Sequence, residues 1–401
     1  MKKEFDIAVV GAGMVGLATA ALLAQTHCRQ NLRITVIDAD KKPHFDVNDD
    51  VGLRVSAISQ GSLRIFRKIG IWDHITALRA SPYRRMRVWD SREPLEGPCT
   101  LRFDAEDFAV SELGFIVENA LIQHALLMKL DELNVAVRFA TPLADISRDH
   151  DGRITGVVLQ DGRDIETDLL IGADGVASSV RQSAGISVSE WRYPQAALVT
   201  HVRPAQDHQQ TAWQRFLRDG PLALLPLADG RVSVVWSTTP EQAKHALSAS
   251  DAELATLLGS ASEHFLGQLE VAGPRGSFPL KSQHAGTYVM PGLVLVGDAA
   301  HAVHPLAGQG ANLGIADAEA LVETVSAALL NGEYPGDLPT LRRYERRRKG
   351  ANKTMLHFVD ALNRLFLVDS TAVATVRSGG MRLFNQSGPL QRRAVRVALG
   401  I

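Results

Sequence analysis

Cysteine is almost absent from this sequence of 401 residues, which holds only Cys28 and Cys99. Two cysteines so far apart cannot build the disulfide framework of a small secreted protein, and they cannot supply the ligand cluster of a metal site. They also exclude the Cys-x-x-x-x-Cys pair of the two-nucleotide disulfide reductases. The scarcity of cysteine therefore indicates a protein of a reducing cytoplasm without a metal centre.

An excess of charge of either sign is missing as well, because 43 Lys and Arg are balanced by 44 Asp and Glu. The formal charge of −1 gives no reason to expect nucleic acid as a partner. Outside residues 7–24, no run of 18 apolar residues occurs, so no segment is predicted to span a membrane. The 7–24 run follows Lys2 and Lys3 and superficially resembles a secretion signal, but Glu4 and Asp6 interrupt the basic region. Three glycines at fixed spacing within the run favour a nucleotide-binding strand and helix instead.

The balanced total hides an uneven distribution of charge. Residues 341–401 hold 13 Lys and Arg but three acidic residues, so the rest of the chain is acidic. A basic stretch at 342–353 is followed by an apolar stripe at helical spacing, formed by Met355, Phe358, Val359, Leu362, Leu365 and Phe366. Two interpretations stay open for this region. It is either a surface that meets anionic lipid or partner proteins, or a helix packed on the acidic body or in a subunit contact.

Short apolar segments indicate a parallel sheet. Residues 5–10 and 33–37 read as buried strands on either side of a glycine turn and an Ala- and Leu-rich helix that reaches about residue 25. Because parallel strands need such a helical crossover, this is a βαβ unit. Residues 169–171 and 293–296 read as further buried strands of the same sheet.

Other segments have an antiparallel texture. Residues 143–168 contain two Asp-Gly pairs between alternating segments, which predicts a three-stranded meander. Between about residues 187 and 282, alternating strands such as 222–227 and 231–236 flank a third Asp-Gly pair, which indicates an inserted antiparallel sheet. The chain beyond residue 311 is predicted to be largely helical, and the sequence has no internal repeat.

The strongest motif is Gly11-x-Gly13-x-x-Gly16, which directly follows the first strand and opens the first helix. In this fingerprint the first glycine permits the tight turn, the second lets a pyrophosphate approach the backbone, and the third allows close helix–strand packing. Free N–H groups and the helix dipole then hold the phosphate charge. Asp38 ends the second strand, where its carboxylate can accept hydrogen bonds from ribose hydroxyls. The motif predicts a dinucleotide cofactor but does not distinguish NAD from FAD.

Two further motifs end predicted strands. Gly-Ala-Asp-Gly at 172–175 contains Asp174, and Gly-Asp-Ala-Ala-His at 297–301 contains Asp298. Asp298 is well placed to accept hydrogen bonds from a sugar-alcohol chain. The glycine-rich stretch 308–314 opens another helix, whose positive N-terminus would stabilise the negative charge of a reduced flavin. For each motif alone, a turn built from Gly and Asp is the alternative explanation.

Together these motifs resemble the group A flavoprotein monooxygenases, the para-hydroxybenzoate-hydroxylase-like family, in order over essentially the whole chain. The stretches HPLAGQGANLG (304–314), LRVSAIS (53–59) and VENALIQHAL (117–126) resemble the ubiquinone-biosynthesis hydroxylases in particular. Within that family, SPYRRMRVWD (81–90), DGPLALLPL (219–227) and the terminal ALGI are most similar to the branch that hydroxylates a 2-polyprenyl-3-methyl-6-methoxy-1,4-benzoquinol.

The resemblance implies that the cofactor is non-covalent FAD and that all three motifs contact it. The ADP half would lie on the glycine fingerprint, the ribitol on Asp298, and the flavin ring against Pro305 and the backbone of 308–312. Arg54 and Asn119 hold positions at which the family contacts the ribose and pyrophosphate. Several relatives have Gln or Arg in place of Asn119, so this chain keeps a donor there but a shorter one. The predicted cofactor-binding residues are Gly11, Gly13, Gly16, Asp38, Arg54, Asn119, Asp174, Asp298, Pro305, Gly308, Gly310, Ala311 and Asn312.

The resemblance also implies the reaction. NAD(P)H would reduce the FAD transiently, O2 would form a C4a-hydroperoxide with the reduced flavin, and an electron-rich aromatic ring would attack the distal oxygen. The spacing of Gly308, Gly310 and Gly314 misses a second G-x-G-x-x-G by one residue, in keeping with a family whose nicotinamide has no Rossmann domain of its own. His304 stands where the prototype hydroxylase has proline, and it is a candidate proton donor or relay. The favoured alternative is a histidine that only satisfies a backbone group.

The sequence therefore predicts an α/β fold with three regions. A Rossmann-like FAD-binding domain would comprise residues 1–80, 100–186 and 283–340, an inserted antiparallel β-sheet substrate domain residues 81–99 and 187–282, and a basic helical C-terminal region residues 341–401. The expected function is FAD- and NAD(P)H-dependent hydroxylation of a polyprenylated phenol or benzoquinol of ubiquinone biosynthesis. The expected location is the cytoplasm, with peripheral attachment to a membrane or a biosynthetic complex if the basic region is a docking surface.

Three alternative functions share part of this pattern. A flavin-dependent halogenase would share the fold, but it should carry a W-x-W-x-I-P stretch that is missing around Trp236. A non-catalytic flavoprotein subunit of a biosynthetic complex belongs to a different class, and turnover of NAD(P)H with quinol-type substrates would separate it from an enzyme. A flavin monooxygenase of another phenolic substrate also stays open.

Overall fold

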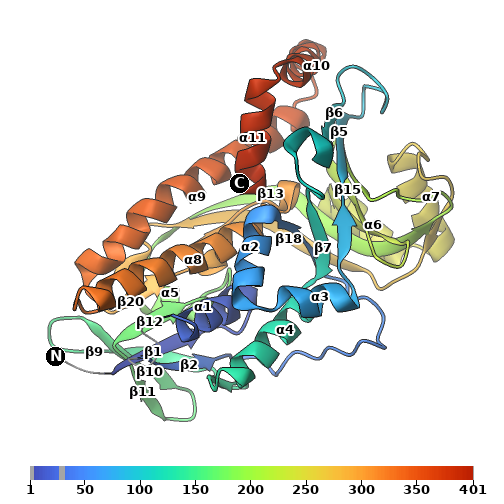
Figure 1. Cartoon of the computed structure of the whole chain (residues 1–401). Coiled ribbons are helices and arrows are strands. Elements are labelled where there is room, and N and C mark those ends of the chain that lie inside the picture. Colours follow the sequence, from blue (N-terminus) through green and yellow to red (C-terminus); the bar gives the residue numbers. More distant parts are fainter. Residues whose placement is uncertain (1–3, 27–31, 401) are drawn as a thin grey trace.

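The computed structural model describes residues 4–26 and 32–400, so Cys28, Lys2 and Lys3 lie outside the described residues. It confirms the predicted α/β fold (Figure 1). The chain opens with β1 (Phe5–Val10), α1 (Met14–Ala24) and β2 (Leu32–Ile37). The predicted βαβ unit is therefore present, and α1 is buried over nearly its whole length because its Ala-rich sequence lets neighbouring elements approach closely.

The first sheet has six strands in the order β19-β20-β12-β1-β2-β8. Its pairs are parallel apart from β19 and β20, and β1 lies between β12 and β2. The strands other than β1 and β2 are β8 (Ala136–Arg138), β12 (Leu169–Gly172), β19 (Val289–Met290) and β20 (Leu293–Leu295). Because the carboxyl ends of parallel strands meet at one edge, the turns after β1, β12 and β20 come together there.

The predicted meander is a separate three-stranded antiparallel sheet of β9 (Leu143–Arg148), β10 (Ile154–Leu159) and β11 (Asp164–Glu166). Gly152 and Gly162 have φ angles of +79° and +84° in its two turns. Only glycine adopts such angles without strain, which is why Asp-Gly predicted both turns correctly.

The predicted antiparallel insertion forms a nine-stranded sheet. Eight of its strands follow one another in a single order, and the ninth, β17 (Leu269–Val271), pairs with β13 outside that order. The order runs β21-β18-β13-β16-β15-β14-β5-β6. Its strands are β5 (Arg85–Asp90), β6 (Leu101–Asp104), β13 (Val188–Pro204), β14 (Thr211–Leu217), β15 (Gly220–Pro226), β16 (Val232–Thr238), β18 (Gly276–Ala285) and β21 (His301–Ala302). Strand β6 lies beyond residue 99, so we propose that the first segment of the substrate domain extends to Asp104.

A fourth, small sheet has three strands in the order β3-β7-β4. It is formed by β3 (Val55–Ser59), β4 (Ser81–Tyr83) and β7 (Gly114–Glu118). The helices of the first two thirds of the chain are α2 (Gln60–Ile69), α3 (Trp72–Leu78), α4 (Asn119–Glu132), α5 (Ser179–Ser183), α6 (Pro240–Ser248) and α7 (Asp251–Ala261). Helices α6 and α7 pack on the nine-stranded sheet through Ala246, Leu254 and Leu258.

The last part of the chain is helical, as predicted, with α8 (Gln309–Leu330), α9 (Leu338–Leu367), α10 (Thr371–Gln386) and α11 (Pro389–Leu399). Figure 1 shows α8 and α9 side by side along the body, and α10 and α11 at the far end of α9. Among the described residues, none of the helices has the length and apolar character needed to cross a bilayer.

The apolar stripe of α9 is mainly a packing surface. Val359 is fully buried in a cluster with Val88, Phe216 and Leu306, and three more members of the stripe (Met355, Leu362 and Phe366) pack against that cluster. Phe358 and Leu365 remain exposed. The arginines of α9 also bind the acidic body, as the Arg347–Glu323 and Arg348–Asp317 ion pairs show. The interpretation of this stripe as a lipid surface is therefore wrong for most of its residues, and packing explains them.

Candidate functional site

The glycine loop after β1 has one open position and two closed ones. A Cβ on Gly11, whose φ angle is +109°, would overlap the backbone of Ala173, and a Cβ on Gly16 would overlap the carbonyl oxygen of Gly11. A Cβ on Gly13 would meet nothing within 4 Å. Gly13 is also the N-cap of α1 and has no side chain to satisfy the first turn. The loop therefore leaves room and free N–H groups at the point where a pyrophosphate would approach.

Asp38 holds this loop from the neighbouring strand. Its carboxylate accepts a hydrogen bond from the Ala12 N–H at 2.5 Å and another from the Asp40 N–H at 2.7 Å. The side chain is partly exposed, so its remaining lone pairs can still accept hydrogen bonds from a ribose. Asp38 thus also holds the backbone of the glycine loop, a structural role in addition to its predicted contact with the cofactor.

The second motif supports the first through its backbone. The carboxylate of Asp174 accepts hydrogen bonds from Ser178, Ser179 and the Val180 N–H, so it caps α5. The backbone of residues 173–174 is what presses against Gly11. Asp174 is predicted to lie near the pyrophosphate. Because its side chain points toward α5, its backbone is the part that remains for this predicted contact.

The third motif places Asp298 in an open position. Gly297 has a φ angle of +58°, and Asp298 follows it with an exposed side chain. Desolvation by the surrounding atoms raises the pKa of Asp298, and His301 and Arg54 offset only part of this rise. A carboxylate that is crowded by protein yet open to solvent is placed to accept hydrogen bonds from the hydroxyls of a bound chain.

The glycine-rich stretch begins α8. Gly308 is the N-cap with a φ angle of +60°, and it has no side chain to cover the positive end of the helix. Pro305 is exposed beside it. The side chain of Asn312 is fully used, because it accepts hydrogen bonds from Ser59 and Ser62 and donates to two carbonyl groups. Only the backbone of Asn312 can therefore contribute to a cofactor site.

Close packing joins the three motifs. Val15 in the first turn of α1 packs where a Cβ on Gly297 or Gly314 would lie. Arg181 is buried and donates hydrogen bonds to the carbonyl oxygens of Ala299 at 2.8 Å and Val176 at 2.9 Å. The sequence separates these segments by more than 100 residues, and the structure brings them to one edge of the parallel sheet.

Arg54 and Asn119 lie together at the β3–β7 sheet. The Asn119 N–H donates to the Arg54 carbonyl at 3.0 Å, and the Asn119 side chain accepts a hydrogen bond from Ser56 at 2.7 Å. Arg54 is exposed, with its guanidinium 6.0 Å from the centre of the Phe278 ring. Sequence reasoning missed Gln123 as a residue that supports the site. Its side chain donates a hydrogen bond to the carbonyl oxygen of Ala12 in the glycine loop at 3.1 Å. Its position four residues after Asn119, on the same face of α4, was the available signal.

His304 does not satisfy a backbone group. Its ring is 1% exposed, and neither ring nitrogen has a hydrogen-bond partner among the described residues. The favoured explanation of this histidine is therefore wrong. The imidazole instead meets the ring of Tyr193 edge-on, with 4.9 Å between centroids and an angle of 88°.

A buried carboxylate that sequence reasoning missed braces the third motif. Asp317 in α8 is fully buried and accepts hydrogen bonds from the Gly297 N–H, from His301 at 2.5 Å, from Arg348 at 2.6 Å and from Asn352 at 3.0 Å. Burial alone would raise the pKa of Asp317, but His301 and Arg348 hold it at about 2. The ionised carboxylate of Asp317 and its four hydrogen-bond donors therefore hold the turn at Gly297, which is followed by Asp298.

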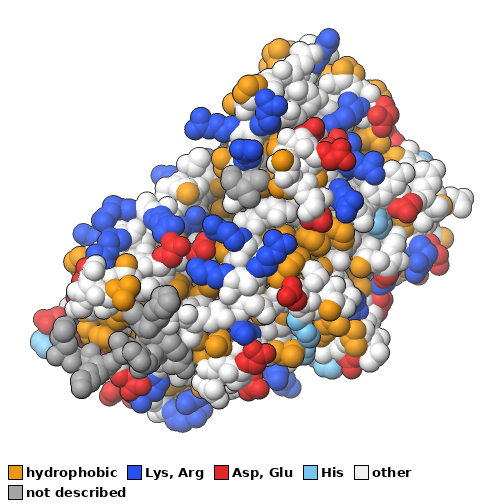
Figure 2. Space-filling model, viewed as in Figure 1, with side chains coloured by type: hydrophobic (Ala, Val, Ile, Leu, Met, Phe, Trp, Pro, Cys, Tyr) orange, Lys and Arg blue, Asp and Glu red, His pale blue; other side chains and the backbone are white. Residues whose placement is uncertain are grey.

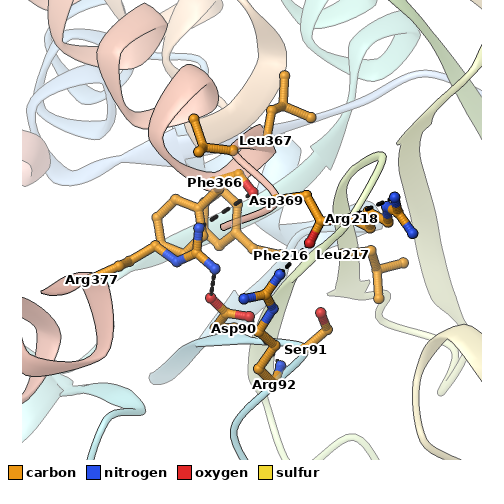
Figure 3. Close-up of a pocket in the computed structure, with 11 residues that line it drawn as sticks. Asp90, Ser91, Arg92, Phe216, Leu217, Arg218, Phe366, Leu367, Asp369 and Arg377 are labelled. Carbon is orange, nitrogen blue, oxygen red and sulfur yellow. Dashed lines mark hydrogen bonds and ion pairs between the residues drawn. The ribbon is translucent and has the colours of Figure 1, made fainter. Parts of the chain in front are cut away.

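Two cavities of similar volume adjoin strands or turns of the nine-stranded sheet. The larger, about 250 Å³, is enclosed by β5, β14 and the segment that joins α9 to α10 (Figure 3). Its apolar wall contains the stacked rings of Phe216 and Phe366, with centroids 3.7 Å apart. Ion pairs form its polar wall, where Arg377 meets Asp90 and Asp369 meets Arg92 and Arg218. None of the predicted cofactor residues lines this cavity, so it is a separate space.

The smaller cavity, about 230 Å³, adjoins the predicted cofactor residues along the chain. Val55 and Glu118, which line it, are the sequence neighbours of Arg54 and Asn119, and Leu227 closes it from the nine-stranded sheet. Glu118 is buried, and desolvation raises the pKa of its carboxyl group.

The residues present fit a dinucleotide flavin. The open Gly13, the uncapped first turns of α1 and α8, and the exposed Asp298 leave a continuous set of polar positions at one sheet edge. Two uncapped helix N-termini suit a pyrophosphate and an anionic reduced flavin respectively.

Comparisons with known proteins agree with this geometry. A family described as "FAD binding domain" matches residues 4–359. The chain is 37% identical to the 3-demethoxyubiquinol 3-hydroxylase of Escherichia coli over 99% of this chain and 98% of that protein. It is 33% identical to the human mitochondrial ubiquinone biosynthesis monooxygenase COQ6 over 98% of this chain and 92% of that protein.

Solved structures share the fold. PqsL of Pseudomonas aeruginosa, in complex with 2-aminobenzoylacetate, superimposes with a TM-score of 0.78 at 24% identity, over 94% of this chain and 99% of that one. The p-nitrophenol 4-monooxygenase PnpA of Pseudomonas putida has a TM-score of 0.77 at 18% identity, over 100% of this chain and 99% of that one. The chain therefore belongs to the FAD-binding-domain family, in the group of FAD- and NAD(P)H-dependent monooxygenases that includes the ubiquinone-biosynthesis hydroxylases.

Proposed function

We propose that this protein hydroxylates the aromatic ring of a polyprenylated quinol of the demethoxyubiquinol type. The observation that carries the proposal is the 37% identity, over nearly the full length of both chains, to a 3-demethoxyubiquinol 3-hydroxylase. The similar identity to COQ6 supports a substrate from the same pathway. An electron-rich quinol suits the chemistry, because its hydroxyl groups donate electron density to the carbon that is attacked.

When bound, FAD would accept electrons from NAD(P)H and supply activated oxygen for the hydroxylation. Gly13 and the first turn of α1 would hold the pyrophosphate, and Asp38 and Asp298 would bind the hydroxyls of the ribose and the ribitol. The N-terminus of α8 would stabilise negative charge on the reduced ring system. Pro305 would cover that ring system and help to exclude water from the reacting atoms.

An apolar cluster that begins beside this site supports the proposed tail of the substrate. Leu306 follows Pro305 in the chain and belongs to the same apolar cluster as Val359 and Phe216. Phe216 and Phe366 continue this cluster to the 250 Å³ cavity. We propose that the prenyl chain lies along this cluster, because each buried CH₂ group contributes about 0.8 kcal/mol.

A substrate series tests the tail site. The KM of the holoenzyme should fall as the prenyl tail grows from one to three isoprene units, and Phe366→Ala should flatten that dependence. Phe358→Ala is the matched control, because Phe358 lies on the same helix but is exposed. Equal dependence on tail length in the wild type and Phe366→Ala would reject this site.

Turnover tests the function itself. With NAD(P)H, O2 and a short-chain demethoxy quinol, the holoenzyme should form a product heavier by one oxygen atom in step with NAD(P)H consumption. Consumption of NAD(P)H with an unchanged quinol, repeated across phenolic analogues, would contradict the proposal. No consumption at all would favour a non-catalytic flavoprotein subunit.

The C-terminal helices supply a second proposal, peripheral binding to an anionic membrane. Helices α10 and α11 expose four large apolar side chains between 60% and 74%, namely Val376, Leu383, Leu390 and Val397. No acidic residue occurs from residue 370 onward. Exposed arginines lie on the same two helices and make no ion pair within the described residues; they are Arg382, Arg392, Arg393 and Arg396. Figure 2 shows basic and apolar side chains together at this end of the molecule.

Charge and apolar area together favour a lipid surface over water. Each exposed arginine near an anionic surface contributes about 1 kcal/mol, and salt weakens the attraction. Replacing the four arginines of α10 and α11 by Gln should therefore lower affinity for anionic vesicles on the order of 10²–10³-fold.

Vesicle flotation measures this effect with neutral and anionic lipid at low and high salt. A matched control removes four arginines of α9, where ion pairs already hold two of them; these are Arg342, Arg343, Arg346 and Arg347. Equal recovery with neutral and anionic vesicles would reject membrane binding and leave protein contacts as the use of this surface.

A further inference from the structure

An imidazole without a hydrogen-bond partner stands next to the proposed flavin contact. His304 directly precedes Pro305, and its ring is buried with both nitrogens unpaired among the described residues. Leaving a buried polar group unpaired costs about 1–3 kcal/mol. Such a group is satisfied by a ligand, an ion or an ordered water, or it stores strain, so its position beside a proposed cofactor contact is what makes His304 a candidate functional residue.

The surrounding side chains hold this ring in place without using its nitrogens. Tyr193 of β13 packs edge-on against it. The Tyr193 hydroxyl donates to Asp360 of α9 at 2.9 Å and lies 3.1 Å from the Ser282 hydroxyl. Asp360 in turn pairs with Arg364 at 2.8 Å. These four polar side chains thus interact with one another, whereas the imidazole nitrogens have no partner among the described residues.

Apolar residues follow this imidazole in the chain, and their character suits an aromatic substrate. Leu306, two residues further along the chain, belongs to the apolar cluster that contains Phe216 and Val359. Apolar residues together with one unpaired polar side chain match the composition of small-molecule sites, in which the polar group fixes the orientation of the ligand.

We propose that His304 is a catalytic residue that accepts the hydrogen bond, and then the proton, of the substrate's ring hydroxyl. This inference rests on the proposed function. As the ring carbon forms its bond to the oxygen supplied by the O2-dependent activity, the O–O bond breaks, and its electron pair leaves with the other oxygen atom, which ends as water at the expense of NAD(P)H. The ring thereby loses electron density and its hydroxyl becomes a protonated carbonyl. The O–H bond breaks, its electron pair completes the C=O bond, and the proton goes to a ring nitrogen of His304. Loss of the proton on the hydroxylated carbon to water then restores the aromatic ring, and return of the proton from His304 to the carbonyl oxygen regenerates the neutral imidazole and the ring hydroxyl.

The protonation state agrees with this role. Burial lowers the pKa of His304 to about 4, with Asp360 acting weakly in the opposite direction. The ring is therefore neutral at pH 7 and has one nitrogen free to accept. A base this weak leaves a bound phenol protonated, but it can take the proton from a protonated carbonyl, which is a far stronger acid.

The experiment compares His304→Leu and His304→Gln with the wild-type holoenzyme on a series of phenols of decreasing pKa. Both variants should keep FAD and its reduction by NAD(P)H, while hydroxylated product falls by roughly 10²–10⁴-fold with an ordinary phenol. The deficit should shrink for phenols that bind already ionised, because these have no proton to lose. His284→Gln is the matched control: burial also lowers the pKa of His284 to about 4, but its ring is hydrogen-bonded to Tyr288 at 3.0 Å.

Product formation by His304→Leu at the wild-type level would overturn the inference, and so would a deficit of equal size for every phenol. If neither variant holds FAD, nitrogen-15 NMR of histidine-labelled wild-type protein decides. Binding of a phenol should shift an unprotonated imidazole nitrogen, and an unchanged histidine spectrum would overturn the contact. Wild-type holoenzyme that hydroxylates no phenol or quinol would instead refute the proposed function.

Discussion

Replacement of Gly13 by Val should remove FAD without unfolding the protein. Gly13 has a φ angle of −70°, which any residue adopts, and a Cβ there meets nothing within 4 Å. The fold should therefore change in stability by no more than about 1 kcal/mol. The valine side chain would occupy the space of the pyrophosphate. Loss of two hydrogen bonds to charged oxygens, at about 1.5–3 kcal/mol each, corresponds to a loss of affinity on the order of 10²–10⁴-fold.

The assay is thermal unfolding of the apoprotein and of protein with added FAD. Bound ligand raises the midpoint of the wild type by mass action, and Gly13→Val should lose most of that rise while its apoprotein midpoint stays near the wild-type value. Gly16→Val is the contrast, because a side chain there overlaps the Gly11 carbonyl and should destabilise the apoprotein itself. Full FAD occupancy in Gly13→Val would refute the assignment of this loop to the pyrophosphate.

Two further predictions concern the third motif. Asp298→Ala should weaken FAD binding by about 1.5–3 kcal/mol without lowering apoprotein stability, because its side chain is exposed; full FAD content on gel filtration would speak against the ribitol contact. Asp317→Asn should destabilise the protein by about 3–5 kcal/mol, because it leaves Arg348 without its buried partner. The folded-state pKa of Asp317 lies at about 2, below the unfolded value, so its stabilisation is present above about pH 4 and is lost as the pH falls toward 2. Chemical unfolding of wild type and variant between pH 3 and 7 should show the two curves converging at the acid end, and a constant difference would contradict the role of this carboxylate.

Local patterns predicted the elements of the fold well. The strands that end in glycine turns, the crossover helix and the Asp-Gly hairpins follow from backbone preferences of a few neighbouring residues, so they can be read from the sequence. The helical period also predicted α9, but it could not separate Val359, which is buried, from Phe358, which is exposed. That difference depends on Phe216 and Leu306, which lie far away in the chain.

The cofactor contacts remain predictions, and the supporting side chains were mostly missed. Asp317 reads as an ordinary surface acid of a helix, because its partners His301 and Arg348 lie 16 and 31 residues away. Arg181 follows the second motif closely in the chain, but its hydrogen bond to Ala299 spans 118 residues. Such contacts depend on which distant segments the sheet brings together, so the helical or strand periodicity of the sequence does not predict them. His304 shows the same limit, because the lack of a partner appears only once the ring's surroundings are known.

Incorporation of oxygen from O2 gas is the most direct test of the central claim. Holoenzyme should be supplied with NAD(P)H, oxygen-18 gas and a short-chain methoxy-methyl-benzoquinol, and the product analysed by mass spectrometry. The account predicts one labelled oxygen atom in the ring of the product. Label that arrives from water instead, or a quinol unchanged in mass while NAD(P)H is consumed, would contradict monooxygenation of this substrate.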